Sequence, residues 1–135
     1  MIDPSDGLVV DTDVVSYILR GDTRATAFVP ILQGRFLVVS FMTVAELDRW
    51  ALMRNWGPTR IAALERHLQS FVVYPFNRAL CKRWAEVIDG AQRQGRPIQT
   101  ADAWIAATAL ELGVPLVTHN PSDYRGVIGL SVVSG

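Results

Sequence analysis

The chain has 135 residues, of which 50% are hydrophobic and 19% are charged, and its formal net charge at pH 7 is zero. This composition excludes a disordered chain, and the neutral balance argues against a protein that coats nucleic acid through overall charge. The single cysteine, Cys81, excludes an intramolecular disulfide, and no apolar run reaches the roughly 18 residues that span a bilayer. The segment MIDPSDG lacks the features of a secretory leader, so we expect a cytoplasmic protein. The length predicts a single domain over residues 1–135.

The first half of the chain alternates short apolar runs with helical spacings. In chain order it predicts a strand over 7–11, a helix over 13–21 after Thr12 as N-cap, a helix over 24–33, a strand over 36–40, a helix over 43–58, a helix over 60–69 and a strand over 71–75. In the helix over 43–58, Thr43 is followed three residues later by Glu46. This spacing predicts a capping box, in which the two side chains bond the first backbone N–H groups of the helix.

The second half continues the alternation. It predicts a helix over 77–97, an apolar helix over 101–112 closed by Gly113, and strands over 115–120 and 130–133. Because the strands alternate with helices and are mostly apolar throughout, we expect a three-layer α/β/α fold with a central parallel sheet of about five strands. In such folds, ligands bind outside the carboxyl ends of the strands, so the polar residues that follow the strands are the candidate site.

Acidic side chains recur at this edge of the expected sheet. Each has a structural explanation of its own: Asp11 fits a turn, Asp13 and Asp102 suit helix N-termini, and Asp123 fits an Asx-turn. Several carboxylates within about 4–6 Å of one another would repel and raise one another's pKa, and a divalent cation removes that penalty. Oxygen ligands without a Cys or His pair favour Mg²⁺ or Mn²⁺ over zinc. Taken together, the acids predict metal-assisted hydrolysis of a phosphate ester.

Four motifs resemble the PIN-domain ribonucleases, and most closely the VapC-type toxins of toxin–antitoxin pairs. The motifs are VVDTDVVSYIL (9–19), VVSFMTVAELDRW (38–50), TADAWIAATALELGVPLVTHNPSDY (100–124) and the terminal strand LSVV. The resemblance implies a Mg²⁺- or Mn²⁺-dependent endoribonuclease whose catalytic and metal-binding residues are Asp11, Glu46, Asp102 and Asp123. It implies further that residues supporting the metal site or contacting phosphate are Thr12, Ser40, Thr118 and Asn120.

Two positions depart from the pattern of these ribonucleases. Asp13 stands where Asn or Ser is common, which adds a carboxylate to the supporting residues, and Tyr124 stands where Phe is frequent. We expect the Tyr124 change to be minor. No departure removes an acid from the site.

The resemblance also implies partners: an RNA substrate, a homodimer and a small antitoxin whose tail covers the active site. Candidate residues for a groove that holds this tail are Leu32, Phe36, Trp50, Met53 and Trp56, unless these side chains only complete the core. Candidate arginines for local RNA contact are Arg49, Arg54, Arg93 and Arg96.

Two other functions compete with a nuclease. A haloacid-dehalogenase-like phosphatase would use Asp11 and Asp13 as an aspartate-x-aspartate pair. That chemistry, like the chemistry of a phosphoacceptor receiver domain, requires a lysine after a late strand, and the only lysine, Lys82, lies in a predicted helix. A binding module that keeps a PIN-like fold without catalysis is the non-enzymatic alternative, and nothing in the pattern of acids favours it.

Overall fold

The structure, a computed structural model, describes residues 6–135 and contains one sheet of five parallel strands in the order β3–β2–β1–β4–β5. The strands are β1 (Gly7–Val10), β2 (Phe36–Ser40), β3 (Val72–Tyr74), β4 (Leu116–Val117) and β5 (Val132–Val133). The chain adds β2 and β3 on one side of β1 and then crosses to add β4 and β5 on the other side. The carboxyl ends of β1 and β4 therefore flank the topological switch point, where ligands bind in such sheets.

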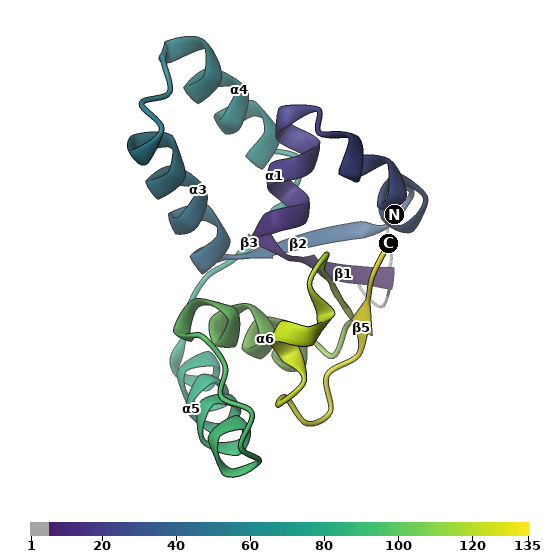
Figure 1. Cartoon of the computed structure of the whole chain (residues 1–135), viewed down its shortest axis with the longest axis vertical. Helices are drawn as coiled ribbons and strands as arrows, with labels where there is room; N and C mark the ends of the chain where they lie inside the picture. The colour runs from purple at the N-terminus through teal and green to yellow at the C-terminus, as the bar shows by residue number, and fades with distance from the viewer. Residues whose placement is uncertain (1–5) are drawn as a thin grey trace.

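Helices cover both faces of the sheet, which confirms the predicted three-layer fold (Figure 1). The helical elements are α1 (Thr12–Arg20), the 3₁₀ helix η2 (Thr23–Ala27), α2 (Val29–Leu32), α3 (Phe41–Met53), α4 (Pro58–Leu68), α5 (Arg78–Arg93), α6 (Thr100–Leu112) and the 3₁₀ helix η3 (Pro121–Tyr124). Figure 1 shows α1, α3 and α4 on one side of the sheet and α5 and α6 on the other. Within residues 6–135, no helix is long and apolar enough to cross a membrane.

Two hydrophobic cores lie on the two faces of the sheet. Leu8 and Val10 of β1 pack with α1 to α4, whereas Val9 packs with α5 and α6, because successive strand side chains point to opposite faces. Helix α6 lies between the sheet and α5, and its buried residues include Ala103, Ile105, Ala106, Ala107 and Ala109. Small side chains let the helix pack closely on both neighbours. The apolar helix is thus an internal layer that carries Asp102 in its first turn.

Helix α3 begins earlier than predicted. The Ser40 hydroxyl caps it by accepting a hydrogen bond from the Met42 backbone N–H at 3.0 Å, so the helix starts at Phe41. Thr43 lies fully buried inside the helix rather than at its cap. The predicted capping box is therefore wrong, and Glu46 is left available for another partner.

The predicted helix over 24–33 is also wrong. The segment contains the short helices η2 and α2 with Phe28 between them. Pro30 explains the break, because proline lacks a backbone N–H and its ring clashes with the carbonyl four residues earlier in a continuous helix. Proline is tolerated only in a first turn, and Pro30 lies in the first turn of α2.

The loop after η3 is anchored on the C-terminal end of α5. The Gln94 side-chain amide donates to the Gly126 carbonyl at 3.0 Å, and a Cβ at position 126 would collide with the Arg96 carbonyl oxygen and lie 2.9 Å from the Ala91 Cβ. We therefore expect Gly126→Ala to lower the free energy of unfolding by about 1–3 kcal/mol in urea denaturation. The control, Gly90→Ala inside α5, meets open space and should raise it by about 0.5–1 kcal/mol. Equal stability of Gly126→Ala and the wild type would contradict the close packing.

Candidate functional site

Asp11 lies at the switch point, directly after β1. Its backbone N–H donates to the Val117 carbonyl of β4 at 2.9 Å, which fixes its place at the sheet edge. Asp11 rather than Thr12 is the N-cap of α1, and its Oδ1 accepts the Thr12 backbone N–H at 2.7 Å. The predicted Thr12 cap is therefore wrong by one residue, and the Thr12 side chain is free to make a different contact.

The second oxygen of Asp11 accepts two hydroxyl groups. The Thr118 hydroxyl and the Tyr124 hydroxyl each lie 2.8 Å from Asp11 Oδ2. The Tyr124 hydroxyl also lies 3.4 Å from Asp102 Oδ1, and the tyrosine is only 2% exposed. A buried phenol therefore stands between the acids of β1 and α6. The expectation that Tyr124 is a minor change is wrong, since the sequence pattern shows only an aromatic residue after Asp123 and gives no sign of where its hydroxyl points.

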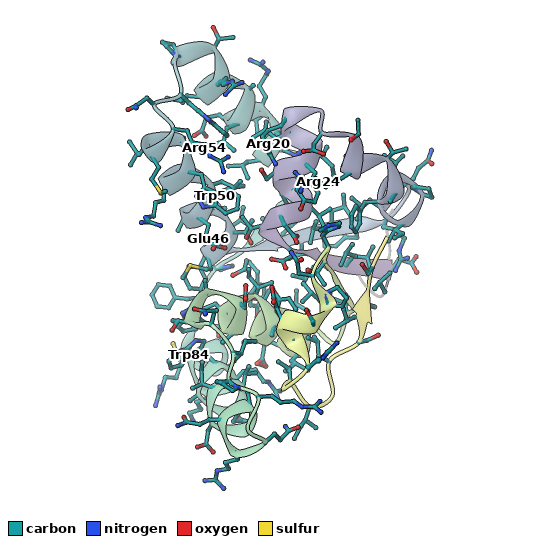
Figure 2. The ribbon with its side chains drawn as sticks, in the orientation of Figure 1. Arg20, Arg24, Glu46, Trp50, Arg54 and Trp84 are labelled. Carbon is teal, nitrogen blue, oxygen red and sulfur yellow. The ribbon has the colours of Figure 1, made fainter. Side chains whose placement is uncertain are left out.

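Glu46 joins the site through Thr12. The Thr12 hydroxyl lies 2.8 Å from Glu46 Oε1 and 2.9 Å from the Thr43 hydroxyl. Because a carboxylate can only accept, Thr12 donates to Glu46 and accepts from Thr43. Figure 2 shows Glu46 in the half of α3 nearer the sheet, with Trp50 farther along the helix and Arg54 just beyond its C-terminal end.

Asp13 has a structural role in addition to its charge. Its Oδ1 accepts the Val14 backbone N–H at 2.7 Å, and its Oδ2 accepts the His119 backbone N–H at 3.2 Å and the Asn120 side-chain amide at 2.9 Å. The carboxylate therefore ties the start of α1 to the loop after β4. Burial raises the pKa of Asp13, whereas these hydrogen bonds act in the opposite direction.

Two of the predicted residues lie outside this hydrogen-bonded cluster. Asp123 is exposed on η3, and within residues 6–135 its side chain forms no hydrogen bond to the other acids. Ser40 is fully buried, but its hydroxyl serves as the cap of α3. The structure thus brings Asp11, Glu46 and Asp102 together, with Asp123 at the rim.

The burial of Asp11 disfavours its ionised form. Burial raises the pKa of Asp11 to about 7, the charges of Asp13 and Asp102 add to the increase, and the hydrogen bonds from Thr118 and Tyr124 reduce it. Burial, followed by the charges of Asp11 and Asp102, raises the pKa of Tyr124. The Tyr124 hydroxyl therefore keeps its proton and acts as a donor.

The pKa values of Asp102 and Glu46 are also raised. Burial and then the charges of Asp123 and Glu46 raise the pKa of Asp102 to about 6, and burial also raises the pKa of Glu46. Among the described residues, no Lys, Arg or His forms a salt bridge with Asp11, Asp102 or Glu46. Helices α1 and α6 begin at the site, and the partial positive charges of their N-termini offset only part of the repulsion.

The PIN domain family matches residues 8–126, nearly the full length of the chain. The chain belongs to the PIN-domain family. Ribonuclease VapC1 of Haemophilus influenzae is 31% identical to this PIN domain over 125 residues, which cover 90% of this chain and 92% of the relative. Toxin FitB of Neisseria gonorrhoeae is 27% identical over 125 residues, covering 87% and 90%. The solved structure of VapBC-1 from nontypeable Haemophilus influenzae matches with a TM-score of 0.80 and 28% identity, covering 95% of this chain and 97% of the solved one. The chain is thus a VapC-type PIN domain.

The donor set of this PIN domain fits a hard divalent cation. Its candidate oxygen donors are carboxylates that form no salt bridge within residues 6–135, and Mg²⁺ and Mn²⁺ prefer oxygen ligands of this kind. Within residues 6–135, Asp102 Oδ2 and Glu46 Oε2 accept no hydrogen bond. In the same range, no three His, Cys, Asp or Glu side chains are already arranged around a single point. The hydroxyl groups of Tyr124 and Thr12 lie among the acids and hold them in place.

Proposed function

We propose that this PIN domain is a metal-dependent endoribonuclease that hydrolyses RNA phosphodiesters with Mg²⁺ or Mn²⁺ held by Asp11, Asp102 and Glu46. The observation that carries the proposal is the hydrogen-bonded cluster at the switch point of the sheet, in which Thr12 and Tyr124 connect Asp11 after β1 with Glu46 of α3 and Asp102 of α6. No cationic side chain in residues 6–135 neutralises them by a salt bridge. VapC-type relatives named as ribonucleases support the same chemistry.

The residues of the site have separate tasks in this proposal. A bound cation would activate water and stabilise the charge that develops on the phosphate. Asp11 is held in one orientation by hydrogen bonds to both of its oxygens. Glu46 is fixed by Thr12 through one oxygen, and its other oxygen is available to orient the attacking water. Asp123, exposed beside Asp102, is placed to contact water at the rim.

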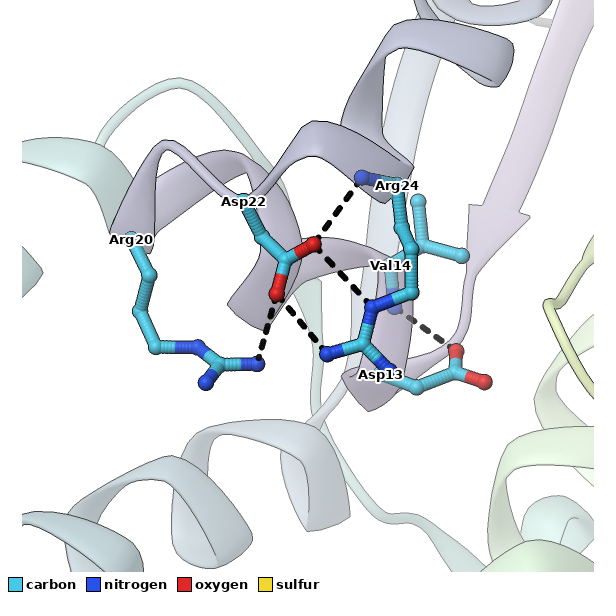
Figure 3. A network of polar contacts seen from close by, with 5 residues as sticks. All are labelled: Asp13, Val14, Arg20, Asp22 and Arg24. Atoms are coloured by element: carbon cyan, nitrogen blue, oxygen red, sulfur yellow. Dashed lines mark hydrogen bonds and ion pairs between the residues drawn. The ribbon is translucent and has the colours of Figure 1, made fainter.

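Two arginines, Arg20 at the end of α1 and Arg24 in η2, are candidates for RNA contact. The Arg24 guanidinium donates to Asp22 at 2.8 and 3.0 Å and lies 4.1 Å from the centre of the Tyr17 ring, while Arg20 lies 3.7 Å from Asp22 (Figure 3). The hydrogen bonds from Arg24 hold the pKa of Asp22 well below its usual range. Figure 3 shows the Arg24 guanidinium between Asp22 and Asp13, so a fixed cation borders the acidic site. Neither arginine was among those predicted from the sequence to contact RNA.

The arginines predicted from sequence differ in their positions. Arg54, directly after the helix that carries Glu46, has its guanidinium 5.5 Å from the centre of the Trp50 ring, and it remains a candidate for RNA contact. Arg93 forms an ion pair with Asp89 in the last turn of α5 at 2.9 Å. The arginines that this leaves as candidates lie in α1, in η2 and at the C-terminal end of α3.

An antitoxin is the proposed protein partner, because structural neighbours of this chain are toxin–antitoxin complexes. Of the residues predicted to line this groove, Leu32 is buried in the core, whereas Trp56 lines a cavity at the surface. Met53 is 60% exposed, and a cavity of about 390 Å³ lies between α3 and α4. Its lining includes Leu52, Trp56 and Ile61. We propose that an apolar segment of the antitoxin packs there and that the pair acts in the cytoplasm.

A homodimer is the proposed assembly. Strand β3 forms one edge of the sheet, and its Val72 and Val73 are exposed. Phe76, two residues after the strand, is 67% exposed. Exposed apolar side chains that gather in one place are typical of protein interfaces, so this edge is the proposed contact between copies.

The structure disfavours the phosphatase alternative. The second aspartate of the pair, Asp13, has both oxygens occupied by the backbone and by Asn120, so it is not free to act as a general acid. Lys82 is exposed on α5 and does not follow a strand. Relatives of this chain include proteins named as ribonucleases and as a toxin, which also argues against a non-catalytic module.

The proposal predicts cleavage of single-stranded RNA that depends on a divalent metal. Purified protein incubated with a labelled RNA oligonucleotide should generate new 5′ ends with Mg²⁺ or Mn²⁺, and EDTA should stop the cleavage because the carboxylates then lack their cation. Adding Mn²⁺ in excess over EDTA should restore it. Cleavage that continued at the same rate in EDTA would rule out the metal mechanism.

A further inference from the structure

The Tyr124 hydroxyl lies between the carboxylates of Asp11 and Asp102, and the proposed nuclease mechanism does not use it. We propose that Tyr124 is a positioning residue of the metal site, whose hydroxyl fixes Asp11 Oδ2 and thereby leaves Asp11 Oδ1 to face the cation. The inference rests on the proposed function, because it requires that Asp11 binds a metal.

The hydrogen bonds of Asp11 determine which of its oxygens stays available. The Tyr124 hydroxyl has one proton to donate. Its contact to Asp11 at 2.8 Å is shorter than its contact to Asp102 at 3.4 Å, so Tyr124 donates to Asp11. Thr118 donates to the same oxygen at 2.8 Å. Two donors occupy the lone pairs of Oδ2, whereas Oδ1 accepts only the Thr12 backbone N–H. Asp11 is thus prepared to bind a cation through one oxygen.

The phenol is held rigidly by the surrounding fold. Tyr124 is the last residue of η3, its ring is buried in the core with α5 and α6, and its carbonyl accepts the Val127 backbone N–H at 3.1 Å. The next turn is anchored by the contact between Gly126 and Gln94. Because backbone and ring are both fixed, the hydroxyl has a set position beside Asp11, as expected for a group that orients a metal ligand.

A purely structural role is the alternative. A buried tyrosine usually finds a hydrogen-bond partner, and Asp11 is such a partner. In that case, removal of the hydroxyl would change stability and leave metal affinity unaltered. The two roles therefore differ in Mn²⁺ binding, which is measured without reference to RNA cleavage.

The experiment compares wild type with Tyr124→Phe, which keeps the ring and removes only the hydroxyl. Mn²⁺ binding to the metal-free protein is measured by calorimetry and by electron paramagnetic resonance, and folding is checked by thermal denaturation. We expect Tyr124→Phe to weaken Mn²⁺ binding by about tenfold, the lower end of the effect of removing a partner of a metal ligand. The substitution should raise the Mn²⁺ concentration needed for half-maximal activity, and it should change turnover at saturating Mn²⁺ by a smaller factor.

Tyr74→Phe serves as the matched control. It removes the same atom from a half-buried tyrosine on β3 whose hydroxyl has only a 3.5 Å contact with the Asn77 side chain, and it should bind Mn²⁺ as the wild type does. Thr118→Val, which removes the other hydroxyl on Asp11 Oδ2, should weaken Mn²⁺ binding in the same direction. Wild-type affinity in Tyr124→Phe would overturn this inference alone, and tighter binding would show that the hydroxyl competes with the metal. A wild type that bound no Mn²⁺ would overturn the proposed function as well.

Discussion

Replacing Asp11 with Asn should abolish RNA cleavage and Mn²⁺ binding. Both oxygens of Asp11 accept hydrogen bonds, from Thr12, Thr118 and Tyr124. An amide has only one acceptor oxygen. Its NH₂ group is itself a donor, so it could not accept the hydrogen bonds that the second carboxylate oxygen accepts. Substitutions of groups that merely support a metal ligand cost about 10–100-fold, so loss of a proposed ligand should lower the cleavage rate by more than about 100-fold. Initial rates on a labelled RNA with Mn²⁺, together with calorimetry, test this result.

Asp89→Asn is the matched control for this substitution. Asp89 lies on α5, it is exposed, and its partner is Arg93 in an i,i+4 pair. Because exposed ion pairs contribute little to stability, this variant should fold and cleave RNA as the wild type does. Cleavage by Asp11→Asn at the rate of the control would refute the assignment of Asp11 as a metal ligand.

The metal-free protein should become less stable as the pH rises from about 4 to about 7. The Asp11 carboxyl has its pKa raised from 3.8 to about 7 by burial and then by the charge of Asp13. Between these values the folded protein binds a proton that the unfolded chain has released, so the free energy of unfolding falls as the pH rises. Each pKa unit corresponds to about 1.4 kcal/mol, and the loss is therefore a few kcal/mol. Asp102, with its pKa raised to about 6, contributes in the same direction within this window.

Thermal denaturation in EDTA across this pH range measures the effect. The informative quantity is the difference in free energy of unfolding between wild type and Asp11→Asn, because other titrating groups contribute nearly equally to both proteins. As the pH rises to about 7, the free energy of unfolding of Asp11→Asn should increase relative to that of the wild type, since the amide carries no charge. Mn²⁺ should restore the stability of the wild type at neutral pH but not change that of the variant. A difference that stayed constant from pH 4 to pH 7 would contradict the raised pKa of Asp11.

Both predictions follow from one physical conflict. The protein buries Asp11 and gathers Asp102 and Glu46 near it, and within residues 6–135 none of the three forms a salt bridge. This burial costs folding free energy whenever the acids are charged. A cation bound at the site would offset that cost. The same charges that destabilise the metal-free protein are therefore the charges that the proposed reaction requires.

The sequence by itself determined the three-layer fold and the edge of the sheet where the acids lie. Strand and helix periodicity is local, and parallel strands place their carboxyl ends at one edge, so Asp11 and Thr118 after their strands were predictable neighbours. Asp102 was predictable in the same way, as an acid in the first turn of an apolar helix. The family resemblance singled out these acids, and Glu46, for the same site.

Only the tertiary structure decided what these residues contact. Glu46 bonds Thr12, 34 residues away, instead of capping its own helix, because Ser40 already caps α3. The Tyr124 hydroxyl reaches Asp11 across 113 residues of sequence. Local patterns record which residues are polar or aromatic but not which distant donor meets which acceptor. Those pairings arise when α1, α3 and η3 come together at the carboxyl end of β1, and they give the acidic cluster its geometry.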